Sequence, residues 1–162
     1  GKTILQNPLP FSYAIHMLEH YYDPFHKSLN KQIMYLSKIF GFCYHIDLHT
    51  MPSKALLNFK KEPDIVLGDN YGKSCSFELL HYFQNIFKEN GFTVETNNPY
   101  AGGFITRNYG NPSQGVHTIQ IEINRKIYMD ENKLSLKNIE ILQEIFAKIF
   151  NNLELSEKIA AE

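Results

Sequence analysis

The sequence predicts an α/β fold, in which helices cover both faces of one mixed β-sheet. Short apolar or β-branched segments alternate along the chain with longer segments whose apolar residues recur every three or four positions. At 162 residues the chain is long enough for a single domain, residues 1–162, with its own hydrophobic core. Neither an internal repeat nor a low-complexity block divides it.

Two helices are expected in the first quarter of the chain. Apolar residues recur at helical spacing over 11–22. We expect Pro24 to end this helix and to lie in the first turn of a second one, which runs to about Phe40. Gly41 follows as the candidate for the left-handed residue that closes a helix.

Three strands and a third helix are expected in the middle of the chain. The helix carries inward-facing apolar residues at helical spacing and ends at Asn90-Gly91, a pair typical of helix termination. The strands are short, apolar and bounded by turn-forming residues. The expected strands are 43–48, 65–67 and 92–96, and the expected helix is 75–89.

A long loop and two further elements complete the chain. Residues 97–115 are rich in glycine, proline and asparagine, and a loop of about this length is usually functional. Within it, residues 104–106 are expected to pair briefly as a strand. Residues 117–124 alternate and are β-branched, which predicts a strand, and residues 135–153 have the spacing of a last helix.

The composition excludes several classes of protein. A net charge of −1 gives no reason to expect nucleic acid as a partner. No apolar run approaches the ~20 residues that cross a bilayer, and the first residues lack the pattern of a secretory signal. Cys43 and Cys75 form neither a disulfide framework nor a metal-type pair. A soluble protein of the reducing cytoplasm is expected, with its oligomeric state open.

His49 is the first candidate for a functional residue. It follows the strand 43–48 directly, and sites in open α/β sheets form at the carboxyl ends of strands. Asp47 alternates to the same face, where a carboxylate can orient the imidazole of a metal-bound histidine. Two interpretations stand: His49 is a metal ligand, or it is a buried histidine with a structural hydrogen bond.

Glu122 is the second candidate. It lies between Ile121 and Ile123, so if the isoleucines face the core, its carboxylate faces the opposite side of the sheet. A buried carboxylate requires a partner or a task. Beside a metal-bound water it would act as general base and later as general acid. The alternative is a salt bridge with Arg125 or Lys126 on a half-exposed strand.

Two arginines supply candidate substrate-binding groups. Arg107 lies in the long loop, and Arg125 directly follows the strand that contains Glu122. The planar guanidinium fork binds a carboxylate through two hydrogen bonds. Each arginine taken alone is also typical of a solvated surface charge.

The remaining titratable candidates are weaker. His26 either contacts substrate or caps the second helix, while His45 and His117 are expected to have structural roles. Cys75 stands at a helix start, where the helix dipole favours a thiolate. Since no histidine is paired with it in the sequence pattern, a cysteine nucleophile is not expected.

Taken together, these stretches resemble the N-formylglutamate amidohydrolase family. They occur in the family's order over about residues 21–131, and several blocks in a fixed order are far more specific than any one of them. The matching stretches are Ile46-Asp47-Leu48-His49-Thr50-Met51-Pro52-Ser53, Asp64-Ile65-Val66-Leu67-Gly68-Asp69, Asn98-Pro99-Tyr100-Ala101-Gly102-Gly103-Phe104-Ile105-Thr106-Arg107, Gly115-Val116-His117, Gln120-Ile121-Glu122-Ile123-Asn124-Arg125 and Tyr128-Met129-Asp130-Glu131.

The resemblance implies a zinc-carboxypeptidase-like fold, of the phosphorylase/hydrolase type, with zinc as the cofactor. It implies that His49 is a zinc ligand, that Glu122 is the catalytic carboxylate, and that Arg107, Asn98 and Arg125 bind the carboxylates of a small acidic amide substrate. The implied reaction is the hydrolysis of N-formyl-L-glutamate to formate and glutamate, late in histidine breakdown.

One departure from the family pattern shapes a further expectation. The family carries its first two zinc ligands, a histidine and an acidic residue, far upstream of the later histidine, whereas only 48 residues precede His49 here. His16 and Glu19 have a ligand-like spacing, but we interpret it as coincidental, with Glu19 and His20 in solvent. An N-terminally truncated domain with an incomplete metal site is expected. The alternative function is an inactive homologue that serves in binding or structure.

Overall fold

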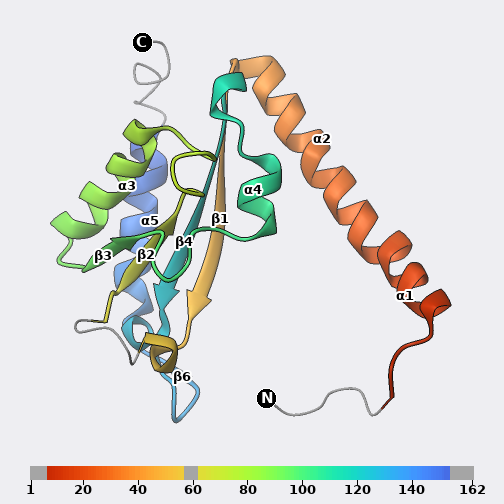
Figure 1. Ribbon diagram of the computed structural model, residues 1–162. Helices are drawn as coiled ribbons and strands as arrows, with labels where there is room; N and C mark the ends of the chain where they lie inside the picture. Colours follow the sequence, from red (N-terminus) through yellow and green to blue (C-terminus); the bar gives the residue numbers. More distant parts are fainter. Residues whose placement is uncertain (1–6, 57–61, 154–162) are drawn as a thin grey trace.

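The computed structural model of the protein describes residues 7–56 and 62–153 (Figure 1). Helices and strands alternate along the chain, as the sequence predicts. The helices are α1 (Phe11–Met17), α2 (Asp23–Phe40), α3 (Phe77–Glu89), α4 (Phe104–Tyr109) and α5 (Ile139–Leu153). The strands are β1 (Cys43–Met51), β2 (Ile65–Gly68), β3 (Val94–Thr96), β4 (Val116–Asn124), β5 (Met129–Asp130) and β6 (Ser135–Leu136).

Four strands form a mixed sheet in the order β1-β4-β2-β3. β1 runs parallel to β4, β4 runs antiparallel to β2, and β2 runs parallel to β3. The carboxyl ends of β1 and β4 therefore lie at one end of the strands, and the carboxyl ends of β2 and β3 lie at the opposite end. His49 and Glu122, which are register partners, both lie in the carboxyl-terminal halves of these two strands.

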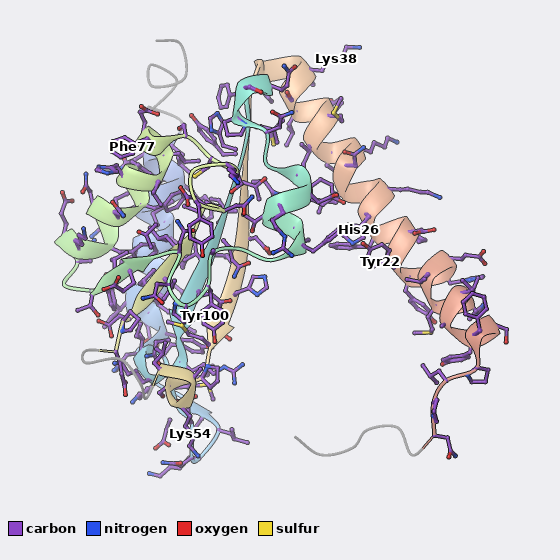
Figure 2. The ribbon with its side chains drawn as sticks, viewed as in Figure 1. Tyr22, His26, Lys38, Lys54, Phe77 and Tyr100 are labelled. Carbon is purple, nitrogen blue, oxygen red and sulfur yellow. The ribbon has the colours of Figure 1, made fainter. Side chains whose placement is uncertain are left out.

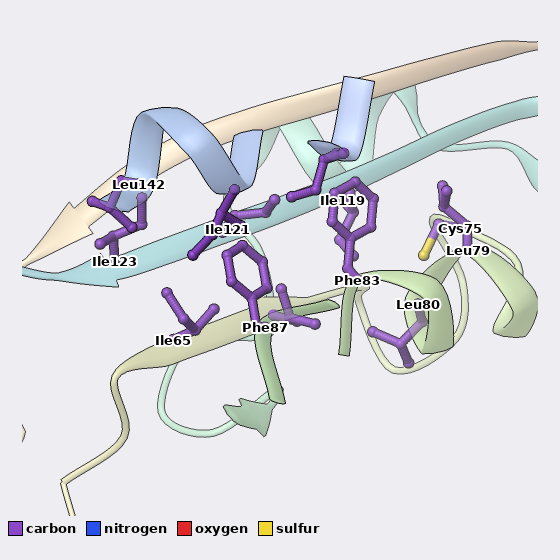
Figure 3. Close-up of a cluster of buried hydrophobic side chains, with 13 residues drawn as sticks. Ile65, Cys75, Leu79, Leu80, Phe83, Phe87, Ile119, Ile121, Ile123 and Leu142 are labelled. Atoms are coloured by element: carbon purple, nitrogen blue, oxygen red, sulfur yellow. The ribbon is translucent and has the colours of Figure 1, made fainter. Parts of the chain in front are cut away.

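The main hydrophobic core lies between the sheet and the helices α3 and α5 (Figures 1 and 3). The β4 isoleucines face this layer, as the alternation of that strand predicts, and the aromatic rings of α3 pack against them. Burying each such side chain contributes about 1.5–3 kcal/mol. The members with the least exposure are Ile65, Leu67, Phe83, Phe87, Ile119, Ile121, Ile145 and Ile149.

The opposite face of the sheet is covered by α2 and α4, so helices lie on both faces as expected (Figure 1). A smaller cluster of Ile33, Cys43, Tyr109 and Val116 joins these helices to the sheet. The segment from α1 to α2 leads away from the sheet toward its N-terminal end, and many of its large apolar side chains are exposed. Among them are Phe11, Met17, Tyr21, Phe25, Met34, Tyr35 and Phe40.

Pro24 does not end the first helix, which corrects one expectation. The chain passes from α1 through a π-helical turn, Leu18–Tyr22, directly into α2, with Pro24 in the first turn of α2. Proline lacks an N–H, and its ring crowds the carbonyl four residues earlier. A wider turn immediately before the proline accommodates both features without a break. The far end follows the sequence: Gly41 adopts a left-handed φ of 80° and closes α2.

Two other elements also differ from expectation. Residues 104–106 begin the helix α4 and do not form a strand, because the extended Gly103 starts a helical turn that buries Thr106. The last helix begins at Ile139, not at residue 135, because Ser135–Leu136 pairs with Met129–Asp130 in a small hairpin. Within residues 7–56 and 62–153, no helix has the length and apolar character that a bilayer crossing requires.

Candidate active site

His49 and Glu122 lie side by side on neighbouring strands. They are register partners in the parallel pair β1 and β4, and Nδ1 of His49 lies 3.7 Å from Oε1 of Glu122. The imidazole is about half exposed, with a side-chain exposure of 46%, whereas the carboxylate is buried. The structure thus brings together the two groups that the sequence singles out. The strand β1 is longer than expected and continues two residues past His49, to Met51.

Asp47 contacts the other nitrogen of His49. Its Oδ1 lies 3.2 Å from Nε2 of the imidazole, because residues two apart on a strand share a face. The second carboxylate oxygen, Oδ2, is buried and has no hydrogen-bond partner in the described part of the chain. The ring of His49 is therefore held between two carboxylates, one from its own strand and one from β4.

Burial raises the pKa of Glu122 above that of an ordinary carboxyl group. The nearby charge of Asp47 acts in the same direction, while His49, a hydrogen bond from Gln120 and the charge of Arg125 act against it. A carboxyl group whose pKa lies closer to neutrality exchanges a proton more readily with a reacting group. The electrostatics of Glu122 suit a general base.

Gln120 is a residue of this site that the sequence reasoning missed. It is buried in β4, two residues before Glu122 on the same face, and its Nε2 donates to Oε1 of Glu122 over 3.0 Å. Its own oxygen accepts the N–H of Gly103 over 2.7 Å. The period of two along the strand was the one signal that pointed to it, since it places Gln120 beside Glu122.

The three predicted substrate-binding residues are placed differently. Arg125 begins the turn after β4, and its Nε donates to the hydroxyl of Thr50, the neighbour of His49. Arg107 is exposed on α4, one turn after Gly103, and Asn98 is exposed in the loop before α4. Among the described residues, neither the Arg107 nor the Asn98 side chain has a hydrogen bond or ion pair to the His49–Glu122 pair.

The donor atoms at this site match zinc in kind but not in number. Imidazole nitrogen and carboxylate oxygen are ordinary zinc ligands, and a catalytic zinc site uses three protein ligands and one open position. Within residues 7–56 and 62–153, no group of three or more His, Cys, Asp or Glu side chains is arranged to hold a metal ion. His49 therefore fits as one ligand of such a site, and the described residues do not complete it.

The other histidines have structural partners. His26 lies on α2, and its Nδ1 is 2.6 Å from the hydroxyl oxygen of Tyr109 on α4. Its ring also packs against Tyr22, in the π-helical turn before α2, and against Phe104, the first residue of α4. Figure 2 labels His26 and Tyr22. Nδ1 of His117 accepts the N–H of Ser76 over 3.0 Å, in agreement with the structural role expected for it.

His45, Cys75 and the exposed N-terminal residues also follow expectation. Nδ1 of His45 lies 3.4 Å from the hydroxyl of Thr118, and burial lowers the pKa of the ring. Burial, with the charge of Asp69, raises the pKa of the Cys75 thiol to about 12, which disfavours a nucleophilic thiolate. The side chains of Glu19 and His20 are exposed.

Known proteins resemble this chain in sequence and in structure. A sequence family described as N-formylglutamate amidohydrolase matches residues 1–129. The chain is 33% identical over 118 residues to an N-formylglutamate deformylase of Pseudomonas putida, which covers 72% of this chain and 44% of that protein. It is 33% identical over 112 residues to the deformylase of Pseudomonas aeruginosa PAO1, which covers 68% and 42% respectively.

A solved structure agrees with both sequence matches. The crystal structure of an N-formylglutamate amidohydrolase from Ralstonia eutropha JMP134 superposes with a TM-score of 0.77 at 29% identity. The superposition covers 97% of this chain and 56% of that one. The chain spans less than half the length of the curated relatives it matches.

Proposed function

The chain belongs to the N-formylglutamate amidohydrolase family, and we propose that it carries reacting groups for the hydrolysis of N-formyl-L-glutamate or a similar acylated acidic amino acid. For N-formyl-L-glutamate the products are formate and glutamate. The observation that carries this proposal is the pair formed by His49 and the buried Glu122, with 3.7 Å between Nδ1 and Oε1. The pair combines a metal-ligating imidazole with a proton-accepting carboxylate at one point.

In the proposed reaction, Glu122 handles the proton. Its carboxylate accepts a proton from the attacking water as the water oxygen forms a bond to the formyl carbon. The protonated Glu122 then donates that proton to the nitrogen as the carbon–nitrogen bond breaks, so that the leaving amine is neutral. The raised pKa of Glu122 supports both halves of this transfer, since the carboxyl group is a stronger base and holds its proton at higher pH.

His49 is proposed to be a zinc ligand, oriented by Asp47. If Asp47 accepts a hydrogen bond from Nε2–H, the lone pair of the imidazole lies at Nδ1, on the side of Glu122. Zinc bound there would polarise the formyl carbonyl and lower the pKa of a bound water from 15.7 to about 7. The role of Asp47 is to fix the tautomer and the plane of the ring.

Substrate binding is proposed for Arg125, Arg107 and Asn98. Arg125 lies nearest to the reacting pair, since its guanidinium contacts Thr50 and its charge acts on Glu122. Arg107 extends from α4 into solvent, where its fork is free to engage a carboxylate of an acidic substrate. An arginine pair of this kind matches the two carboxylates of a formylated acidic amino acid.

The physiological setting belongs to the same proposal. Glutamate release from its N-formyl derivative is a late step of histidine breakdown, and we assign the chain to that step in the cytoplasm. The two cysteines, Cys43 and Cys75, are buried as free thiols, which suits a reducing compartment.

One observation favours a second candidate function. The described residues supply a single histidine near Glu122 and no three-ligand metal group. An incomplete set of metal ligands is expected of a homologue that kept the fold for binding or structure and lost catalysis. Metal analysis separates the two functions: about one tightly held zinc per chain supports the hydrolase, and none supports the inactive homologue.

The test of the hydrolase is Glu122→Gln in the full chain, with formate release from N-formyl-L-glutamate as the readout. Loss of a general acid–base group lowers turnover by about 10²–10⁴-fold. The matched control is Glu95→Gln, an exposed glutamate on β3, which leaves turnover unchanged. Equal denaturation midpoints for the two variants would show that folding is intact. Wild-type turnover by Glu122→Gln would remove the role assigned to this residue.

A further inference from the structure

We infer that Gln120 is a positioning residue that fixes the Glu122 carboxylate to the backbone at the start of α4. This inference rests on the proposed function of Glu122. Gln120 is 4% exposed and uses both ends of its side-chain amide, donating to Oε1 of Glu122 over 3.0 Å and accepting from the N–H of Gly103 over 2.7 Å. A buried amide engaged at both ends has one orientation.

The backbone of Gly103 decides that orientation. An N–H group only donates, so the amide oxygen of Gln120 must face Gly103. The NH₂ group of Gln120 is then turned toward Glu122, whose carboxylate accepts the hydrogen bond. The donor at Glu122 is thus set by the main chain of a loop that is 17 residues away from Gln120 in sequence.

The contact selects one oxygen of Glu122 for the proton. Oε1 is the oxygen that accepts from Gln120 and lies 3.7 Å from the His49 ring. Oε2 has no hydrogen-bond donor in the described part of the chain. The structure therefore assigns Oε2 as the atom that takes the proton of the attacking water, while Oε1 stays anchored.

Gly102 allows the turn that brings the Gly103 backbone to Gln120. A Cβ at Gly103 would lie 3.4 Å from Oε1 of Gln120, and one at Gly102 would lie 2.7 Å from the Thr106 side chain. Gly102 also has a φ of 114°, which disfavours any other residue. Gly102 is therefore the position where a side chain would disturb the loop, whereas a Cβ at Gly103 would only touch the Gln120 oxygen. Because Gly103 directly precedes α4, its hydrogen bond to Gln120 also anchors the helix that carries Arg107.

Two substitutions separate the two contacts of Gln120. Gln120→Glu keeps an oxygen for the N–H of Gly103 but replaces the NH₂ donor to Glu122 with a second carboxyl oxygen, whereas Gln120→Met loses both contacts with nearly the same volume. The matched control is Gln84→Met, because Gln84 also uses its amide in a side-chain hydrogen bond, to Thr96 at a distance from the site. All are tested in the full chain.

Kinetics and hydrogen exchange give independent readouts. For N-formyl-L-glutamate, Gln120→Glu is expected to lower kcat by about 10- to 100-fold with KM little changed, as for other residues that orient a reacting group. The exchange of the Gly103 amide hydrogen should match wild type in Gln120→Glu and become faster in Gln120→Met. In Gln120→Met, KM should also rise, because α4 and Arg107 lose their anchor. Gln84→Met should change none of these quantities.

The outcomes distinguish this inference from the proposed function. Wild-type kcat in both Gln120 variants, with Glu122→Gln inactive, overturns the inference and leaves the function standing. The proposed function fails if wild type shows no turnover or if Glu122→Gln keeps full turnover. NMR of the ¹⁵N-labelled chain then still tests whether Gln120 contacts Glu122. The side-chain NH₂ signals of Gln120 should then shift in Glu122→Ala, and unchanged signals would overturn the contact itself.

Discussion

Asp47 and His49 form a carboxylate–imidazole contact along a single strand, with Oδ1 3.2 Å from Nε2. The two residues share a face of β1 because they are two positions apart. The opposite nitrogen of the ring faces Glu122 on β4. The imidazole thereby meets two carboxylates at its two nitrogens, and this arrangement leads to a prediction about metal affinity.

Removing either partner should weaken zinc binding. Asp47→Asn is expected to lower zinc affinity by about 10- to 100-fold, because the residue that fixes the tautomer of a ligating histidine has that effect. His49→Ala should lower it further, since the ligand itself is lost. Competition with a chromophoric chelator measures the affinity, and His81→Ala, an exposed histidine on α3, is the control. Equal zinc affinity of His49→Ala and wild type would argue against a metal at this position.

Arg107→Ala should raise KM and leave kcat nearly unchanged. If Arg107 binds a carboxylate of the substrate equally in the ground state and the transition state, its loss weakens binding by roughly tenfold or more without slowing the chemical step. Initial rates over a range of N-formyl-L-glutamate concentrations test this. Lys88→Ala removes an exposed cation from α3 and should have no effect. An unchanged KM for Arg107→Ala would contradict the assignment.

The stability of the protein should fall in mild acid through His117. Burial lowers the pKa of this ring, the charge of Glu78 opposes the shift, and Nδ1 must stay unprotonated to accept the N–H of Ser76. The folded state therefore binds fewer protons than the unfolded state between the lowered pKa and the ordinary value of about 6.5. The free energy of unfolding is fully present above that value and decreases as pH falls through the window.

Urea denaturation at several pH values measures this decrease. His117→Gln removes the titrating group, so the pH dependence between neutrality and the lowered pKa should become flatter. His81→Gln, at an exposed position, should keep the slope of wild type. If His117→Gln and wild type lose stability in parallel, the acid sensitivity comes from another group.

Gly68→Ala should destabilise the fold through a backbone collision. A Cβ at Gly68 would lie 2.7 Å from the carbonyl carbon of Ala101 and 2.7 Å from the backbone nitrogen of Gly102. Main-chain atoms cannot move aside as a flexible side chain does, so a loss of about 1–3 kcal/mol in unfolding free energy is expected. Gly103→Ala, whose Cβ would meet its nearest atom at 3.4 Å, should cost much less. Equal denaturation midpoints for the two variants would refute this account.

The local sequence pattern was sufficient to predict which face of the sheet Glu122 lies on. The alternation of β4 places Ile121 and Ile123 in the core and the carboxylate on the other face, as the structure has it. The helix α2 and its end at Gly41 were also predicted correctly, because proline and glycine act through their own backbone preferences. Such features depend on residues close together in sequence.

Contacts between segments far apart in the chain could not be predicted from the sequence. The register that pairs His49 with Glu122 joins residues 73 positions apart, and no local rule sets it. Ile105 and Thr106 are β-branched and locally favour a strand, yet tertiary packing against β4 makes them part of α4. Gln120 was missed for the same reason, because its importance comes from Gly103, which folds back onto it.

Nine successive register pairs join β1 to β4, from Cys43 and Val116 to Met51 and Asn124. The spacing between hydrogen-bonded strands varies little, at about 4.8 Å. The backbone positions of His49 and Glu122 take their separation from this ladder and not from any loop. Loops elsewhere around the sheet can therefore lengthen or change in sequence while the backbone distance between these two positions stays constant.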